Sequence, residues 1–190
     1  MVTATAFDAA GWLAKHTRGG THLSREAQEA VSGFTTMWNF FESTVCDNRA
    51  SIAAFERALA RWRPSQVAPE TSQVIDECLA FWRFRYRTPV GFGERFEGLH
   101  FRPADRRAHV ERVLSGEVDD PSAKMLALMI IVYRLRNNLF HGLKSIEMLN
   151  DQVQNLATAT RCLAGILEAI PSRWVKPAGR EMHSPRRVGR

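Results

Sequence analysis

Apolar side chains recur at steps of three and four residues along most of the chain, which is the spacing of an amphipathic helix. The pattern is clearest after Ser24, a candidate N-cap, and predicts a long helix from there to about Cys46. Five further predicted helices cover residues 50–62, 70–86, 104–115, 121–141 and 146–169. No two segments of alternating polarity flank a tight turn. We therefore expect an all-α, single-domain bundle of five to six helices with no significant sheet.

Helix-breaking residues divide the chain into three parts. Residues 1–23 are rich in Ala, Thr and Gly and predict at most a short helix, so this N-terminal segment is expected to be only partly ordered. Residues 24–170 hold the predicted domain, in which Asp120-Pro121 opens the fifth helix as N-cap and first helical residue. Residues 88–103 contain three glycines and two prolines and predict a long loop that is functional or packed by its own aromatic residues.

The net charge of +6 first suggests a polyanion partner, but its position along the chain changes that interpretation. Residues 171–190 contain six basic residues and a single acidic one, Glu181, so most of the excess charge lies in this tail. Its prolines and glycines favour a basic, flexible C-terminal tail. Binding of a polyanion by the tail stays open.

Cysteine usage and hydropathy favour a cytoplasmic protein with no membrane partner. The three cysteines, Cys46, Cys78 and Cys162, are odd in number and lack a CxxC spacing, which is typical of reduced thiols in a core. The longest apolar run, Met125 to Tyr133, is far shorter than the roughly 20 residues of a membrane span. The first basic residue, Lys15, follows an acidic one, an order that is atypical of a secretory signal.

Several common chemistries lack their motifs in this chain. The stretch "GFGERFEG" has GxG without GxGxxG, and there is no GxxxxGK[ST] or HExxH. The six histidines show no spacing of zinc ligands. Two acidic pairs, Asp76-Glu77 and Asp119-Asp120, fit helix capping or a solvated face better than a two-metal site. We therefore expect neither a metal nor a cofactor.

The segment "FWRFRYR", residues 81–87, alternates aromatic and arginine residues and allows two interpretations. It could stack bases and contact phosphates of a single-stranded nucleic acid. On a helix, however, Trp82 and Tyr86 share a core-facing stripe, and Arg83 and Arg87 share a neighbouring face. A core helix whose arginines extend to solvent is the favoured interpretation.

The segment "LALMIIVYRLRNNLFHGLK", residues 126–144, ends an apolar helix in Arg136, two Asn and His141 before Gly142. Buried charge is costly unless it is paired or used. Cationic residues near a helix C-terminus also suit the helix dipole, so simple capping stays open. Five residues of helix place Arg136 and His141 about 140° apart around the axis. The two could meet on one target only if the last turn opened or a second copy of the helix lay opposite.

The stretch "RNNLFHG" resembles the R-x4–6-H motif of the HEPN superfamily of small α-helical ribonuclease domains. Three other Arg–His pairs have a matching spacing, but only this one has a polar residue after Arg, Gly after His and a place at the end of a long apolar helix. The segments "FEGLHFRPADRRAHVERVLSG" and "KMLALMIIVYRLRNNLFHGLK" are similar to the C-terminal half of small bacterial HEPN proteins. The aromatic first helix "FTTMWNFFES", with Glu42, is similar as well.

The resemblance implies a metal-independent endoribonuclease in which the RNA 2′-hydroxyl attacks the adjacent phosphate. His141 would be the acid/base, Arg136 would stabilise the phosphate, and Asn137 and Glu42 would support them. Two further basic residues, Arg134 and Lys144, would bind the RNA.

The resemblance also implies biological partners. HEPN proteins usually form a homodimer with a composite active site, and many are toxins or anti-phage (abortive infection) effectors restrained by an antitoxin or regulatory protein. Leu143 stands where some such toxins carry a Tyr that is adenylylated, so that mode of control is not expected. Two alternatives stay open: a non-catalytic HEPN-like domain that binds RNA or protein, and an unrelated helical interaction protein.

Overall fold

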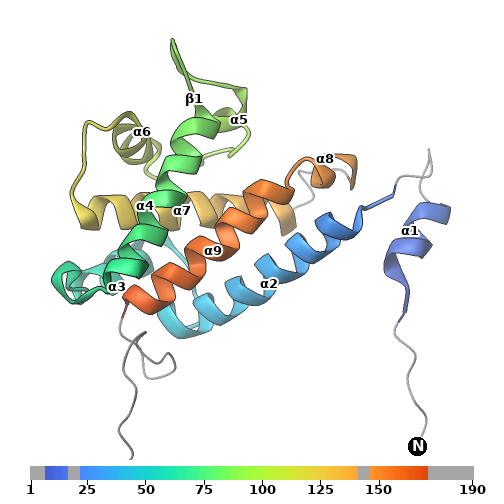
Figure 1. Cartoon of the computed structure of the whole chain (residues 1–190), viewed down its shortest axis with the longest axis horizontal. Coiled ribbons are helices and arrows are strands. Elements are labelled where there is room, and N and C mark those ends of the chain that lie inside the picture. The colour runs from blue at the N-terminus through green and yellow to red at the C-terminus, as the bar shows by residue number, and fades with distance from the viewer. Residues whose placement is uncertain (1–6, 17–21, 141–145, 171–190) are drawn as a thin grey trace, which may run out of the picture.

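The computed structural model describes residues 7–16, 22–140 and 146–170, and these residues are mostly helical (Figure 1). The all-α fold class predicted from the sequence is confirmed, with one very short sheet in the described part. The helices are α1 (Ala9–His16), α2 (Arg25–Val45), α3 (Ile52–Ala60), the 3-10 turn η1 (Pro64–Gln66), α4 (Pro69–Tyr86), α5 (Glu94–Glu97), α6 (Arg107–Ser115), α7 (Pro121–Phe140), α8 (Ile146–Asn150) and α9 (Val153–Ala169). The strands are β1 (Arg87–Thr88) and β2 (Gly91–Phe92), which pair antiparallel.

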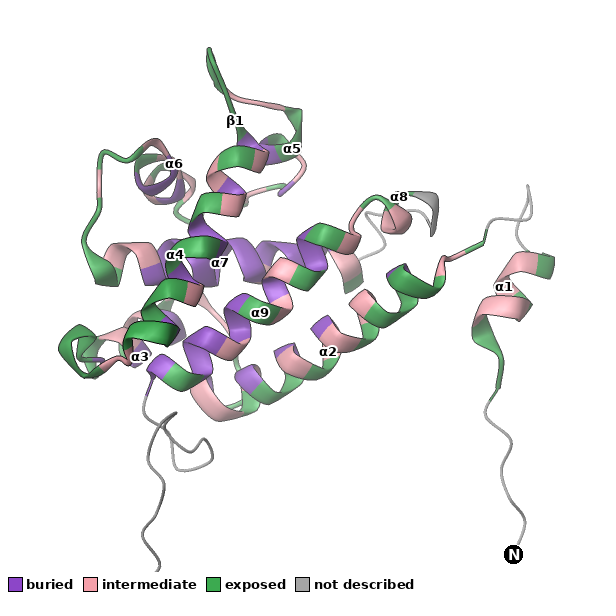
Figure 2. Ribbon diagram, viewed as in Figure 1, coloured by how far each residue is buried: buried purple, intermediate pink, exposed green. Residues whose placement is uncertain are grey.

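The bundle is built around α7 and α9. Helix α9 packs between α2 and α4, and α7 contacts α3, α4, α6 and α9 (Figure 1). Every residue of α7 from Met125 to Val132 is buried (Figure 2). Other elements surround this part of the helix, which explains why it is apolar on all sides. The apolar run that the sequence placed in a core helix is therefore the centre of the fold.

Local capping signals place two of the main helices as predicted. The Ser24 hydroxyl accepts a hydrogen bond from the backbone N–H of Ala27 at 3.1 Å and begins α2. A carboxylate oxygen of Asp120 accepts one from the N–H of Ala123 at 2.9 Å, and Pro121 is the first residue of α7. Both caps satisfy backbone donors that the first helical turn cannot pair internally.

The helix predicted over 146–169 is divided into α8 and α9, with a break at residues 151–152. Asn150, the last residue of α8, accepts a hydrogen bond from the N–H of Ser24 and donates one to the carbonyl of His22, both at 2.9 Å. The side chain thus binds the segment that leads into α2. Because that segment is distant in the chain, the break between α8 and α9 accompanies a tertiary contact rather than a local one.

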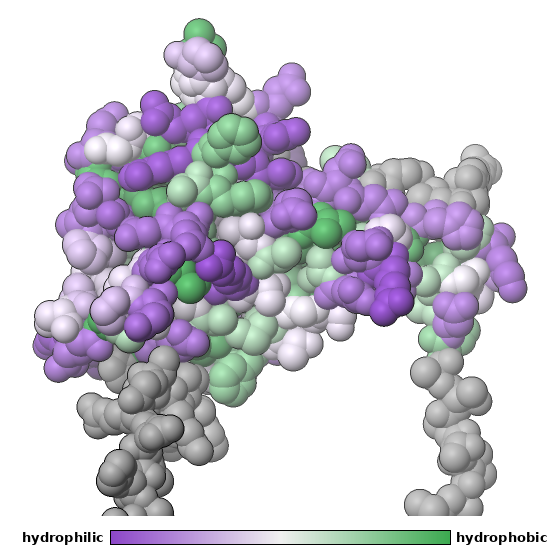
Figure 3. Space-filling view, viewed as in Figure 1, coloured by the Kyte–Doolittle hydropathy of each residue, from purple (hydrophilic) through white to green (hydrophobic). Residues whose placement is uncertain are grey.

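The predicted loop over 88–103 contains a small hairpin and the single-turn α5, and aromatic rings pack it. Phe96 lies within 4.4 to 5.8 Å, centroid to centroid, of three other rings, those of Tyr86, Phe92 and Phe101. The hairpin tip is exposed, and Val90 there is 97% accessible. Figure 3 shows a hydrophobic apex on a projection that is otherwise close to neutral.

Helix α4 confirms the favoured interpretation of "FWRFRYR". Trp82 and Tyr86 are buried, and Trp82 Nε1 donates to Asn155 Oδ1 of α9 at 2.9 Å. Arg83 lies at the edge of the core, where Nη2 donates to the Val113 carbonyl at 2.9 Å. The rings of Trp82 and Tyr86 are thus unavailable for stacking on bases, because the core of the bundle encloses them, whereas the Phe84 ring is 88% exposed.

The three cysteines are buried and form no disulfide, as their spacing predicted. Within the described ranges, no helix combines the length and the apolar character that a membrane crossing requires. The predicted C′ glycine Gly142 and the basic tail lie outside the described residues.

Candidate functional site

The polar end of α7 sends its side chains in different directions. Arg134 and Asn138, one turn apart, reach the loop between α5 and α6. Arg136 reaches α2 instead. Two residues of helix turn the chain by about 200°, so neighbouring arginines of "RLR" face opposite neighbours.

Arg134 is an interior structural residue. Its side chain is only 2% exposed, and Nη1 lies 3.0 Å from Asp105 Oδ2. Its Nε and Nη2 donate to the carbonyls of Leu99 and His100 at 3.1 and 2.6 Å. Burial lowers the pKa of Arg134, and the Asp105 carboxylate opposes that change. The RNA contact predicted for Arg134 is thus not supported, because its guanidinium is enclosed and used by the loop.

Asn138 also attaches the loop after α5 to α7, a role that the sequence did not predict. Its Nδ2 donates to the carbonyls of Gly98 and Leu99 at 3.0 and 3.2 Å. Asp105 also accepts a hydrogen bond from the backbone N–H of Arg102 at 2.8 Å. Two α7 side chains therefore hold the loop 98–105 against the end of the central helix.

Arg136 is partly exposed and lies beside a carboxylate that the sequence also singled out. Its side chain is 30% accessible, and Nη2 lies 4.0 Å from Glu42 Oε2. The guanidinium carbon sits 5.8 Å from the Trp38 ring centroid and 5.0 Å from that of Phe140. The charge is therefore held between two aromatic faces and one acid, a setting that restricts its motion while leaving one side open.

The Glu42 carboxylate is held by two hydrogen bonds besides its contact with Arg136. Its Oε2 accepts a hydrogen bond from Trp38 Nε1 at 2.8 Å, and its Oε1 accepts one from the backbone N–H of Ala50 at 3.2 Å. These two donors hold the carboxylate at the end of α2. Trp38 lies four residues before Glu42 on α2, which is the spacing that allows this bond.

Two donors of this cluster have no partner in the described structure. Arg136 Nη1 donates to Asn137 Oδ1 at 3.3 Å, whereas Arg136 Nε and Asn137 Nδ2 are buried without an acceptor. Buried donors are normally paired, so unfilled ones are notable. We call Trp38, Glu42, Arg136, Asn137 and Phe140 the Arg136 cluster. It offers a fixed and partly exposed cation that suits an oxyanion.

The remaining predicted site residues, His141 and Lys144, lie outside the described residues. His141 follows Phe140, the last residue of α7, directly in the chain. Among the described residues, no group of His, Cys, Asp or Glu could hold a metal ion. The structure thus brings together Arg136, Asn137 and Glu42 of the predicted site and separates Arg134 from them.

Comparisons of the chain with models of protein families, with curated proteins and with solved structures give no match.

Proposed function

We propose that this protein is a metal-independent endoribonuclease of the HEPN type whose active site includes Arg136 and His141. The observation that supports the proposal most is the Arg136 cluster. A partly exposed guanidinium is held by Glu42 and by aromatic rings in the last turn before His141.

The chemistry requires few groups. The 2′-hydroxyl of one nucleotide attacks its own 3′-phosphate, its proton passes to a base, and the 5′-oxygen of the next nucleotide leaves with a proton from an acid. The products are a 2′,3′-cyclic phosphate and a 5′-hydroxyl. His141 would move these protons near neutral pH, and Arg136 would stabilise the charge that develops on the phosphate oxygens. Glu42 would orient Arg136, and Asn137 would donate to the substrate or to Arg136.

Two copies of α7 would complete the site in this proposal. A straight helix separates Arg136 and His141 around its axis, so a second copy could supply the histidine that meets each arginine. Phe40 and Phe140 are exposed near the ends of α2 and α7 and would suit such an interface. The proposed role is that of a toxin or an anti-phage effector, restrained by an antitoxin or regulatory protein.

The test is cleavage of RNA by the purified full chain in the presence of EDTA, with analysis of the product ends. We expect 2′,3′-cyclic phosphate and 5′-hydroxyl ends from the parent. Arg136→Ala and His141→Ala should each lower the rate by roughly 100-fold or more, the size of effect typical of a lost acid/base or charge-stabilising group. Matched controls are Arg61→Ala and His22→Ala, both at exposed positions.

Light scattering of the same samples gives the oligomeric state. Cleavage by both site variants at the parental rate would disprove the site assignment. If no RNA is cut but the folded protein binds RNA or a protein partner, the non-catalytic alternative is the better description.

A further inference from the structure

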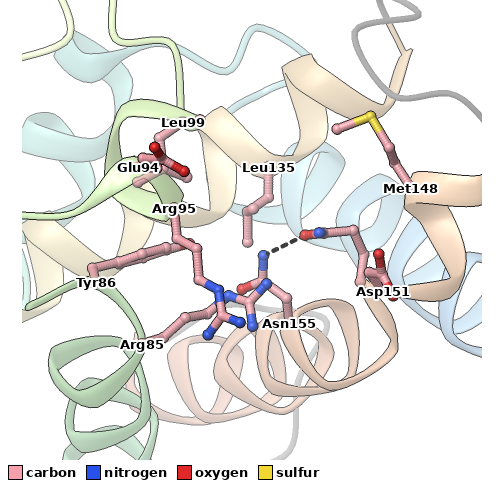
Figure 4. Close-up of a pocket in the computed structure, with 11 residues that line it drawn as sticks. Arg85, Tyr86, Glu94, Arg95, Leu99, Leu135, Met148, Asp151 and Asn155 are labelled. Atoms are coloured by element: carbon pink, nitrogen blue, oxygen red, sulfur yellow. Dashed lines mark hydrogen bonds between the residues drawn. The ribbon is translucent and has the colours of Figure 1, made fainter.

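A cavity of about 500 Å³ lies on another side of α7, where α4, α5 and the α8–α9 junction meet (Figure 4). Its volume is within the range of small-molecule sites. Leu135 and Leu99 form apolar parts of its wall, and charged side chains form others. Leu135 lines this cavity while its neighbour Arg136 contacts α2, so the cavity is separate from the Arg136 cluster.

Two arginines meet in this cavity. Arg85, from α4, and Arg95, from α5, extend toward the same place in the centre of the view (Figure 4). Neither forms an ion pair with a carboxylate in the part of the chain that the structure describes, and the buried Nε of Arg85 has no acceptor. Nearby arginines are paired: Arg107, for example, binds both Glu97 and Glu111. Two unneutralised guanidinium groups at one place favour an anion between them.

The wall of the cavity adds a third unfilled group. Tyr86 is 1% exposed, and its hydroxyl forms no hydrogen bond of good geometry, although Arg85 and Asn155 lie beside it. Burial raises the pKa of Tyr86, and the neighbouring Arg85 and Asn155 oppose that change. The phenol is therefore protonated at neutral pH and can donate a hydrogen bond. Asn155 beside it is fixed, because Oδ1 accepts from Trp82 and Nδ2 donates to Gln152 at 2.9 Å each.

Acidic side chains also line the cavity and narrow the class of ligand. Glu94 and Asp151 are exposed. In Figure 4 the Glu94 carboxylate lies away from the two guanidinium groups, and Asp151 lies across the cavity from Arg85. Their oxygens can accept hydrogen bonds from hydroxyl groups of a ligand. A ligand that carries only negative charge would not use them.

We propose that this cavity binds a phosphate monoester on a small hydroxylated body of about the size of a ribose. A monoester carries up to two negative charges and three terminal oxygens, which match two arginine forks, whereas one arginine is sufficient for a carboxylate. The apolar wall covers the body, and Glu94 and Asp151 receive its hydroxyl groups. The site does not depend on the proposed RNA cleavage.

The group could come from a free sugar phosphate or from the 5′-phosphate of an RNA end, and calorimetry on the full chain distinguishes them. The probes are ribose 5-phosphate, ribose, and a short RNA with either a 5′-phosphate or a 5′-hydroxyl. We expect saturable binding of one phosphate monoester and at least tenfold weaker binding of its unphosphorylated partner. The tighter of the two phosphorylated probes identifies the source.

Variants test the assignment. Arg95→Gln, at an exposed position, and Arg85→Gln should each weaken phosphate binding by about tenfold, the typical loss for one charge-assisted hydrogen-bonding group. Arg87→Gln removes the same charge from an exposed arginine that does not line the cavity and should bind as the parent does. Thermal unfolding shows whether Arg85→Gln is folded, and Arg95→Gln decides the matter if it is not. Parental affinity in Arg95→Gln, or no phosphate monoester that binds saturably and more tightly than its unphosphorylated partner, would overturn the proposal.

Discussion

Oε2 of Glu42, on α2, lies 4.0 Å from Nη2 of Arg136, on α7, although the two residues are far apart in the sequence. Trp38 and the backbone of Ala50 hold the carboxylate in place. The arginine therefore meets a preorganised acid rather than a mobile one. This contact connects the first long helix to the end of the central helix, at the point where the candidate motif begins.

The Glu42–Arg136 contact predicts that Glu42→Gln lowers RNA cleavage more than it lowers stability. The amide can still accept from one donor, but it no longer carries the charge that faces Arg136. We expect a loss in rate of about tenfold, which corresponds to about 1.4 kcal/mol in the activation free energy. The measurement is the cleavage rate beside a thermal unfolding curve. Glu29→Gln, on the same helix but exposed, is the control. A fully active, folded Glu42→Gln protein would show that the carboxylate has no orienting role.

The buried pair of Arg134 and Asp105 predicts a large loss of stability when the acid is removed. Asp105→Ala leaves the Arg134 charge buried without its counter-charge, and we expect a decrease of about 3–5 kcal/mol in the free energy of unfolding. Chemical denaturation measures this. Asp119→Ala is the matched control, since the Asp119 carboxylate faces Arg83 and Lys124 at the surface. Similar small losses in both variants would contradict an interior role for Arg134.

Asn138 predicts a local effect in the loop 98–105. Asn138→Ala removes both hydrogen bonds to the loop carbonyls and should cost about 1–3 kcal/mol, because those buried acceptors lose a donor. Hydrogen exchange should become faster in the loop while the centre of α7 stays protected. Asn39→Ala, at an exposed position of α2, should leave exchange unchanged. Uniformly faster exchange over the whole chain would instead indicate a global loss of stability.

The interaction of Glu97 with Arg107 predicts that the protein loses stability as the pH falls into the acid range. Its hydrogen bonds with Arg107 hold the pKa of Glu97 below its usual range, with burial opposing this. A carboxyl group with a lowered pKa in the folded state contributes stability above its unfolded pKa of about 4.3, and this contribution is lost as the pH falls through the folded value. The difference in melting temperature between the parent and Glu97→Gln should therefore be largest near neutral pH and disappear in acid. A difference that is constant with pH would show that the charge of Glu97 is not the cause.

Much of the fold follows from local sequence because its causes are local. The apolar spacing of three and four residues gives the helices, and the side chains of Ser24 and Asp120 cap α2 and α7 within three residues of themselves. The break between α8 and α9 could not be predicted in this way, because Asn150 binds the segment before α2, which is distant in the chain. The cavity with Arg85 and Arg95 likewise combines residues of several elements that no single motif brings together.

The sequence by itself determined that α7 is a buried helix whose last turns carry an unusual set of polar residues. The residues around the motif favoured Arg136, but the sequence could not show that Arg134 is structural, because both arginines have a spacing to His141 that fits the motif. The tertiary structure distinguishes the two arginines. Asp105 and the loop carbonyls enclose Arg134, whereas Arg136 lies partly open between α2 and the end of α7. The physical reason is that a helix turns about 100° per residue, so two residues that are near in sequence contact different neighbours, which only the packing of distant segments supplies.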